Sequence, residues 1–380
     1  MKFISALILF IGLLSCSSET GSTLKGNDVT SNRTDIKKPV VVTKDIPIEF
    51  AQNFMLHAIP NGYRLELIDP NSQEIELSYE LTYDTEKKGD NIIHIPITNI
   101  AALSQTTVGM ISSLGALDDL TGILNIDYVY DPTVKKLFSN GKITEFKDET
   151  NFPIETAVQA KTEVIIYSGF GKEFPQEKKL QKFGIKAIPN YDWRETHPLG
   201  RAEWIKFVGV LCGKVEEAEK TFNVIKKEYE DLRWKIRKLE DTPTVLSGNF
   251  WGDQWTAPAG ESYMAILISD ARGDYMYKRS AGTGSIFLSM ESVIMKNEKT
   301  KIWINPGFNT KEKIVAGNPK GQHVGPFKGK PGTGIYCYSH EMNKFWERGA
   351  LEPHHILSDL IHVFHPEFEP DSELYFYQKL

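Results

Sequence analysis

A run of four polar residues, Ser104-Gln105-Thr106-Thr107, stands directly before a helical pattern. The apolar residues of that pattern, Val108, Ile111 and Leu114, recur every three residues, as on one face of an α-helix. A hydroxyl or amide side chain at a helix start accepts a hydrogen bond from a backbone N–H, and the N–H groups that remain can donate to a ligand. The run therefore predicts either a helix start that faces a binding cleft or a cap whose only role is to stabilise the helix.

The motifs of common enzyme classes are incomplete in this chain. No G-x-S-x-G elbow is present, and residues 325–330, followed by Pro331, depart from the phosphate-binding loop. His340-Glu341 lacks the second histidine of a zinc protease. Four histidines near the C-terminus could hold a metal in a metal-dependent enzyme: His354, His355, His362 and His365. We expect no enzymatic activity, no cofactor and no metal site, with the metal-dependent enzyme as the alternative.

The N-terminus has the pattern of a lipoprotein signal. Lys2 precedes an apolar segment that ends in Leu13-Leu14-Ser15-Cys16, which resembles the lipobox of bacterial lipoproteins. We expect residues 1–15 to be removed as a signal peptide and Cys16 to be acylated, which anchors the protein to a bacterial membrane in the periplasm. Residues 16–45 are largely polar and predict a flexible tether. An ordinary secretory signal is the alternative.

Composition and charge narrow the class of protein. The chain has 380 residues, enough for two domains, and its 41% hydrophobic and 25% charged residues are typical of a globular protein. The net charge of −6, without a basic patch, argues against nucleic acid as a partner. We expect a monomer in which Cys212 and Cys337 are small core residues rather than a disulfide or a metal pair.

Residues 214–240 form the longest helical pattern in the chain. Apolar residues recur there at steps of three and four, and charged residues occupy the positions between them. A helix of this length measures about 40 Å. It either lies along a single domain or connects two lobes rigidly.

Strands alternate with helices before and after this long helix, which indicates α/β lobes with largely parallel sheets. Strand-like segments at 63–68, 75–83 and 92–97 predict a small β meander ahead of them. The expected divisions are a β extension over residues 46–95, an N-terminal lobe over 96–212, a connecting helix over 213–241 and a C-terminal lobe over 242–380.

Two segments of the chain resemble each other. Residues 154–158 form a short apolar helical pattern that leads into the strand 164–168, and residues 290–294 lead in the same way into the strand 302–305. One copy lies on each side of the long helix. The pair therefore favours two similar lobes, with a ligand between the carboxyl ends of their sheets.

Several segments, in their order along the chain, resemble a known family. They are Tyr191-Asp192-Trp193, residues 197–204, 261–263, 269–271, 345–347 with Gly349, 357–360 and 364–366. Over about residues 95–380 the chain is similar to the helical-hinge (class III) substrate-binding lipoproteins of ABC importers for ferric siderophores, haem or vitamin B12. The resemblance implies two Rossmann-like α/β lobes joined by one long α-helix.

The resemblance also implies partners. In that family one exposed glutamate on each lobe pairs with arginines of the membrane permease, which works with ATPase subunits. The matching positions are Glu155 and Glu291, the acidic residues of the two repeated segments. The alternative for each is a glutamate favoured at a helix N-terminus by the helix dipole.

Candidate ligand residues come from loops expected to face the cleft: Ser104, Gln105, Thr106, Phe170, Tyr191, Trp193, Arg194, Trp251 and Trp255. Aromatic side chains suit a flat, conjugated ligand, although each tryptophan could instead pack within a lobe. Arg194 or Arg201 could pair with ligand carboxylates. We expect an iron complex, a siderophore or haem, with cobalamin as the alternative. In the vitamin B12-binding branch of that family, an aromatic residue precedes the first docking glutamate, and Phe152 lies in that region here. Residues 284–287, before Glu291, contain no tryptophan, and this departure disfavours cobalamin.

Overall fold

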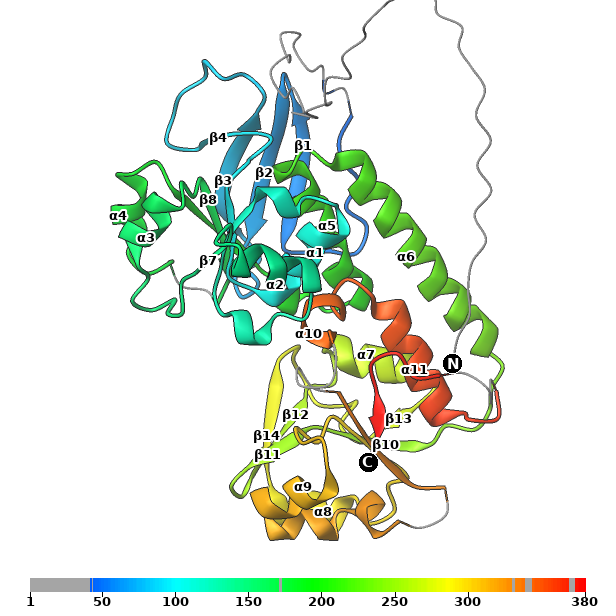
Figure 1. Ribbon diagram of the computed structural model, residues 1–380. Coiled ribbons are helices and arrows are strands. Elements are labelled where there is room, and N and C mark those ends of the chain that lie inside the picture. Colours follow the sequence, from blue (N-terminus) through cyan, green and yellow to red (C-terminus); the bar gives the residue numbers. More distant parts are fainter. Residues whose placement is uncertain (1–41, 43, 171–172, 330–331, 339–343, 369–372) are drawn as a thin grey trace, which may run out of the picture. The chain divides into compact units, whose positions relative to one another are not determined.

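A computed structural model describes residue 42 and residues 44–170, 173–329, 332–338, 344–368 and 373–380 (Figure 1). All of these residues belong to one compact unit, Val40–Leu380. The signal peptide, most of the tether and Cys16 lie outside the described residues, as does His340-Glu341. Among the helices that the structure describes, none is both long and apolar enough to cross a membrane.

A four-stranded sheet precedes the two lobes. Its strands, in the order β1-β2-β3-β4, are β1 (Phe54–Ile59), β2 (Gly62–Ile68), β3 (Ile75–Thr82) and β4 (Ile92–His94). The three predicted strands are present as β2, β3 and β4, but only β2 and β3 are antiparallel, because β4 runs parallel to β3. Strand β1, which pairs antiparallel with β2, was not predicted. Two buried carboxylates hold the segment that enters this sheet. Glu203 accepts from the N–H groups of residues 49–51, and Glu195 accepts from those of Gln52 and Asn53.

The first lobe contains a five-stranded sheet of order β7-β6-β5-β8-β9 in which all neighbours are parallel. Its strands are β5 (Ile100–Ala102), β6 (Leu120–Ile123), β7 (Thr144–Glu145), β8 (Val164–Ser168) and β9 (Lys186–Asn190). Its helices are α1 (Gln105–Ser113), α2 (Pro132–Ser139), α3 (Ile154–Gln159), α4 (Glu177–Gln181) and α5 (Pro198–Leu211).

The second lobe contains a sheet of order β13-β10-β15-β16-β17, parallel except for β17, and an antiparallel sheet of order β11-β12-β14. Its strands are β10 (Thr244–Ser247), β11 (Asn249–Trp251), β12 (Gln254–Pro258), β13 (Asp274–Tyr275), β14 (Ser285–Ser289), β15 (Ile302–Ile304), β16 (Gly334–Cys337) and β17 (Gln378–Lys379). Its helices are α7 (Tyr263–Asp270), α8 (Met290–Lys296), α9 (Lys311–Gly317), α10 (Phe345–Arg348) and α11 (Pro353–Phe364).

The two sheets share the order of four neighbouring parallel strands, β6-β5-β8-β9 in the first lobe and β13-β10-β15-β16 in the second. The first strand of each lobe, β5 or β10, lies between the second strand and the strand that follows the repeated segment, β8 or β15. In both copies the repeated segment is a short helix, α3 or α8, as the internal comparison predicted. This shared order confirms two similar α/β lobes.

Helix α6 (Val215–Ile236) contacts both lobes (Figure 1). Near its start Ala218 meets the backbone of α5 at Gly209, and farther along the Tyr229 hydroxyl donates to Asp270 of α7 at 2.7 Å. The helix also packs along α11. Of the two alternatives, the connecting helix is therefore confirmed. Its 22 residues span about 33 Å, because it ends at Ile236 rather than at Glu240 as predicted.

Both faces of each parallel sheet are buried, because successive strand residues point to opposite sides. In β8, Ile166 belongs to the largest hydrophobic cluster, while Ile165 belongs to a cluster confined to the first lobe. In β15, Ile304 joins the same largest cluster and Trp303 a cluster confined to the second lobe. A common core thus joins the lobes, and each lobe adds a core of its own.

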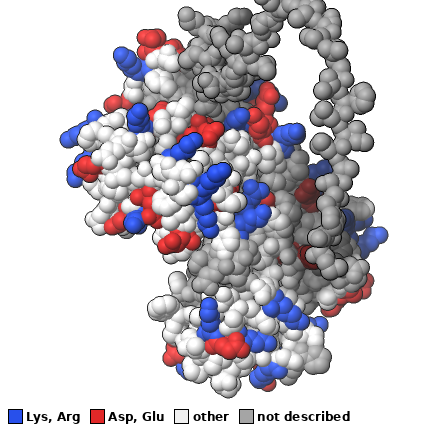
Figure 2. Space-filling view, viewed as in Figure 1, with Lys and Arg blue, Asp and Glu red and all other residues white. Residues whose placement is uncertain are grey.

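The expectation that the two cysteines are core residues agrees with the structure. Cys212 and Cys337 are buried and form no disulfide. On the face shown in Figure 2, acidic and basic side chains are interspersed rather than gathered by sign.

Candidate functional site

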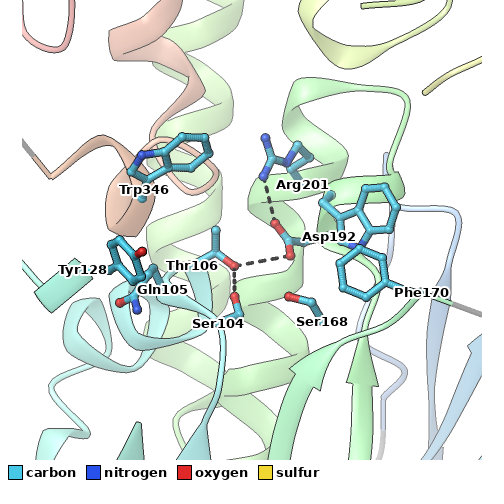
Figure 3. A pocket seen from close by; sticks show the side chains of 10 residues that line it. Ser104, Gln105, Thr106, Tyr128, Ser168, Phe170, Asp192, Arg201 and Trp346 are labelled. Atoms are coloured by element: carbon cyan, nitrogen blue, oxygen red, sulfur yellow. Dashed lines mark hydrogen bonds and ion pairs between the residues drawn. The ribbon is translucent and has the colours of Figure 1, made fainter. Parts of the chain in front are cut away.

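A cavity of about 470 Å³ lies at the carboxyl ends of β5, β8 and β9 (Figure 3). Its lining residues are Ser104, Gln105, Thr106, Tyr128, Ser168, Phe170, Asp192, Trp193, Arg201 and Trp346. Loops after parallel strands meet at this edge of a sheet, which is where open α/β sheets bind ligands. The volume falls in the range of small-molecule sites.

The polar floor of the cavity is the start of α1. Ser104 caps this helix by accepting from the N–H of Thr107, and its hydroxyl lies 2.6 Å from the Thr106 hydroxyl. The Gln105 side-chain carbonyl is buried and has no hydrogen-bond partner among the described residues. The predicted helix start is confirmed, and it presents polar groups to the cavity.

Aromatic side chains stand on two sides of the cavity. Phe170 and Trp193 pack together with ring centroids 5.0 Å apart, and Tyr128 and Trp346 lie on the opposite side (Figure 3). The indole of Trp193 donates to the Gly169 carbonyl at 3.0 Å, which fixes its orientation. Such walls can contact both faces of a flat conjugated ligand.

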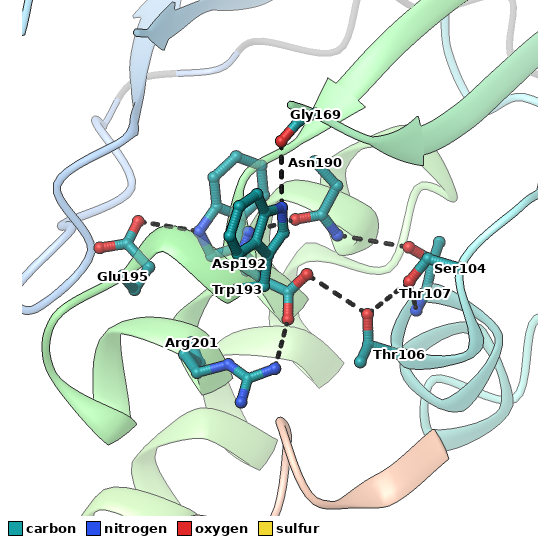
Figure 4. A network of polar contacts seen from close by, with 10 residues as sticks. Ser104, Thr106, Thr107, Gly169, Asn190, Asp192, Trp193, Glu195 and Arg201 are labelled. Atoms are coloured by element: carbon teal, nitrogen blue, oxygen red, sulfur yellow. Dashed lines mark hydrogen bonds and ion pairs between the residues drawn. The ribbon is translucent and has the colours of Figure 1, made fainter. Parts of the chain in front are cut away.

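A buried ion pair stands beside the polar floor (Figure 4). Asp192, in the single-turn 3-10 helix Asp192–Arg194, accepts from Arg201 of α5 at 3.1 Å and from the Thr106 hydroxyl at 3.3 Å. The guanidinium lies over the Tyr263 ring at 4.3 Å, and its Nε has no partner among the described residues. Arg201 lines the cavity, so the pair places a guanidinium beside the polar floor, and a guanidinium can bind carboxylates.

The structure brings five of the nine predicted ligand residues together at this cavity: Ser104, Gln105, Thr106, Phe170 and Trp193. It places the other four outside the lining. Tyr191 is 1% exposed, and its hydroxyl donates to Glu76, away from the cavity. Arg194 donates to the Asn71 side chain at 2.7 Å and packs on Trp193.

The two tryptophans after the connecting helix are on a hairpin rather than in the expected loop. Trp251 ends β11 and is 90% exposed, whereas Trp255 in β12 is fully buried against Trp303. For Trp255 the packing alternative therefore describes the structure.

Five lining residues were not among those nine: Tyr128, Ser168, Asp192, Arg201 and Trp346. Of these five, only Arg201 had been named before as a possible partner of ligand carboxylates. Asp192, Arg201 and Trp346 belong to segments that carried the family resemblance, and Ser168 ends a strand that was predicted. Those two signals could have identified four of them. Tyr128 ends the short 3-10 helix that follows β6, and because neither that strand nor that helix was predicted, no signal marked this residue.

The two glutamates of the repeated segments occupy matching places. Glu155 is exposed in the first turn of α3, and Glu291 is exposed in the first turn of α8. Glu291 pairs with Lys320, which also pairs with Asp253 at 2.9 Å. Hydrogen bonding from Lys320 lowers the pKa of Glu291.

Three of the C-terminal histidines pack against neighbouring residues. His354 lies 3.3 Å from Glu228 of α6, and burial lowers its pKa to about 3. His355 stacks on Tyr375, and His365 contacts the Ala271 carbonyl at 3.1 Å. Within the part of the chain that the structure describes, no three histidine, cysteine or acidic side chains form a metal cluster.

Relatives and solved structures support one assignment. An uncharacterized lipoprotein of Methanocaldococcus jannaschii is 25% identical over 309 residues, which is 77% of this chain and 72% of that protein. A possible iron-binding, periplasmic solute-binding protein of Staphylococcus epidermidis has a TM-score of 0.55 at 16% identity, over 71% of this chain and 99% of its own. A periplasmic haem-binding protein of Pseudomonas aeruginosa has a TM-score of 0.55 at 12% identity, over 74% and 97% of the two chains.

At these identities the solved structures establish the fold: two α/β lobes joined by a helix. The family model for periplasmic binding proteins matches residues 100–314, more than half of the sequence. This match covers the cavity floor, both repeated segments and the connecting helix. The chain belongs to the periplasmic binding protein family.

Proposed function

We propose that this protein is the substrate-binding component of an ABC importer, that it captures an iron complex and that it delivers the complex to the membrane permease. Siderophore and haem complexes are the preferred ligand classes, and cobalamin is the second choice. The mechanism is binding and docking without chemical change of the ligand. Family membership supports the binding role, and the similarity to a possible iron-binding protein and to a haem-binding protein supports the ligand class.

One observation carries the ligand assignment: the cavity has aromatic side chains on two sides and a polar floor between them. Flat conjugated groups such as porphyrins and catecholates bury large areas against aromatic rings. Arg201 lines the cavity, and its guanidinium offers a partner for the carboxylates that haem carries. The Tyr128 phenol at the cavity is an oxygen donor of the kind that holds iron in some haem proteins.

Tryptophan fluorescence tests the ligand class, because Trp193 and Trp346 line the cavity. The protein is titrated with haemin, a ferric tris-catecholate and cyanocobalamin. We expect saturable 1:1 quenching by haemin or the ferric catecholate, and weaker quenching by cyanocobalamin. Absence of saturable quenching by all three would exclude the proposed ligand classes.

Docking on the permease is assigned to Glu155 and Glu291. One exposed carboxylate on each lobe can fix both position and orientation on a partner that presents arginines. Replacing both by alanine should leave ligand affinity unchanged and abolish uptake of the labelled ligand in cells. A matched control is Glu177→Ala with Glu312→Ala, which also removes one first-turn glutamate from each lobe. Uptake that survives the first pair, or is lost equally with the second, would refute the assignment.

The membrane anchor is assigned to Cys16, outside the described residues. The lipoprotein name of the relative supports an anchored protein on the outer side of the membrane. Because that relative comes from an archaeon, Methanocaldococcus jannaschii, the similarity does not indicate that the membrane is bacterial. Cys16→Ser should move the protein from the membrane fraction to the soluble fraction. Retention in the membrane fraction would contradict acylation at this position.

A further inference from the structure

Helix α10 (Phe345–Arg348) comes from the second half of the sequence but packs on α1 of the first lobe. The backbone carbonyl of Glu347 occupies the space where a side chain at Gly109 would begin. Arg348 donates to the Ser113 hydroxyl at 2.6 Å. Helix α10 therefore sits directly on α1, and it presents Trp346 to the cavity floored by the start of the same helix.

The Glu347 side chain makes a second connection. It is 3% exposed, and its carboxylate accepts from the backbone N–H groups of Tyr130 and Asp131. The carboxylate of Asp131 is engaged elsewhere, where it caps α2 and accepts from Ser112. The Glu347 carboxylate therefore binds the backbone of Tyr130 and Asp131, a segment that begins two residues after Tyr128.

This arrangement joins the two members of one cavity wall. Trp346 directly precedes Glu347, and Tyr128 stands two residues before the segment that Glu347 holds. Both rings lie on the same side of the cavity (Figure 3). Their common support is a buried carboxylate, although burial raises the pKa of Glu347 and so disfavours its charged form. Residues that support ligand-contacting side chains in this way tune affinity without touching the ligand.

We propose that Glu347 is a positioning residue of the ligand site, which holds Tyr128 and Trp346 together as one aromatic wall. The proposal rests on the proposed function in taking this cavity as the ligand site. It predicts that the Glu347 side chain couples the position of Tyr128, in the first lobe, to that of Trp346 on α10. Glu347→Gln keeps the size of the side chain but replaces one accepting oxygen with an amide that donates.

The first experiment needs no ligand. Hydrogen–deuterium exchange is measured for the amides of Tyr130 and Asp131 in the wild type and in Glu347→Gln. We expect both amides to exchange at least about tenfold faster in the variant, because the amide side chain removes one of their acceptors. Glu203→Gln is the control, since Glu203 is as deeply buried and also accepts from backbone N–H groups, but outside the cavity. Unchanged exchange at both amides in Glu347→Gln would overturn the proposal.

The second experiment is a double-mutant cycle on the affinity for haemin and for a ferric tris-catecholate. Glu347→Gln should weaken binding about tenfold in the wild type and less than about twofold in the Tyr128→Ala/Trp346→Ala background. A residue that only stabilises the fold would give the same factor in both backgrounds, and that result would overturn the proposal. Glu203→Gln should not change either affinity.

Failure of the proposed ligand classes and misfolding of the variant can each be distinguished from failure of this proposal. If the wild type binds neither probe, the proposed ligand classes fail, and the exchange experiment alone decides whether Glu347 holds the wall. If Glu347→Gln does not unfold cooperatively, Glu347→Asp replaces it, since the shorter side chain withdraws the carboxylate from the same two amides. The same exchange and affinity criteria then apply to Glu347→Asp.

Discussion

The two lobes share the order of four neighbouring parallel strands, but the segments that follow the carboxyl ends of those strands differ. In the first lobe the chain after β5, β8 and β9 opens into the cavity. In the second lobe β10 leads through Gly248 into the β11–β12 hairpin, and Trp255 of that hairpin packs on Trp303 with centroids 5.3 Å apart. After β15, Asn305 accepts from the hydroxyl of Tyr377 at 2.9 Å. In the described part of the second lobe, the segments after β10 and β15 therefore pack against its own side chains.

The difference shows that the cavity is formed by the segments after the strands rather than by the sheet itself. Of the ten described residues that line the cavity, nine precede the connecting helix and one, Trp346, comes after it. The second lobe thus reaches the ligand site through α10, while its own sheet edge carries the exposed hairpin. Substitutions in one lobe can therefore be compared with matched substitutions in the other.

The largest effect is expected at the ion pair of the first lobe. Arg201→Met leaves the Asp192 carboxylate buried without its cation, since the side chains of Asp192 and Arg201 are 3% and 12% exposed. Removing one partner of a buried pair costs about 3–5 kcal/mol of unfolding free energy. Urea denaturation measures this loss, and binding of haemin should weaken as well.

The matched change in the second lobe is Lys320→Met, which removes the cation shared by Asp253 and Glu291. Those side chains are exposed, so the ion pairs are screened by water and the urea midpoint should not move measurably. Equal losses in the two variants would show that burial does not distinguish the ion pairs of the two lobes.

The next effect concerns pH. Burial of Glu195 raises its pKa to about 7, above its ordinary value of 4.5. The folded protein therefore holds this proton more tightly than the unfolded chain, and stability falls as pH rises from about 4.5 to about 7. The expected loss is about 3 kcal/mol at most. Glu195→Gln should flatten the stability profile over that range.

Asp359 of the second lobe provides the comparison. It accepts from the N–H groups of residues 375–377, and burial raises its pKa also. Because Asp359→Asn leaves Glu195 unchanged, the fall in stability between about pH 5 and pH 7 should persist in this variant. If Asp359→Asn flattens that slope and Glu195→Gln does not, the assignment to Glu195 is wrong.

Local signals in the sequence predicted much of the first lobe. The cap at Ser104, the strand Val164–Ser168 and the helical pattern that became α5 each depend on neighbouring residues alone. The two repeated helix–strand segments also follow from local periodicity. The loops after these strands form the cavity, so five of the nine predicted ligand residues line it.

Contacts between residues far apart in the sequence could not be predicted from these local signals. The placement of Trp346 depends on α10 packing more than 200 residues away on α1, as the bond from Arg348 to Ser113 shows. The β11–β12 hairpin turns at Gly252-Asp253, and a Gly-Asp pair at this two-residue spacing is itself a hairpin signal, so the expectation of a loop there overlooked a local signal. That prediction placed both Trp251 and Trp255 at the ligand site.

The smallest effect separates the aromatic residues of the two lobes. Phe170→Ala removes a ring that lines the cavity and packs on Trp193, and should weaken haemin binding about tenfold, or about 1.4 kcal/mol. Trp251→Ala removes the 90% exposed ring of the second lobe and should leave the affinity unchanged. Quenching titrations of both variants measure the difference. If Trp251→Ala weakened binding as much as Phe170→Ala, the hairpin would have to reach the ligand, and the second lobe would contribute more to the site than α10 alone.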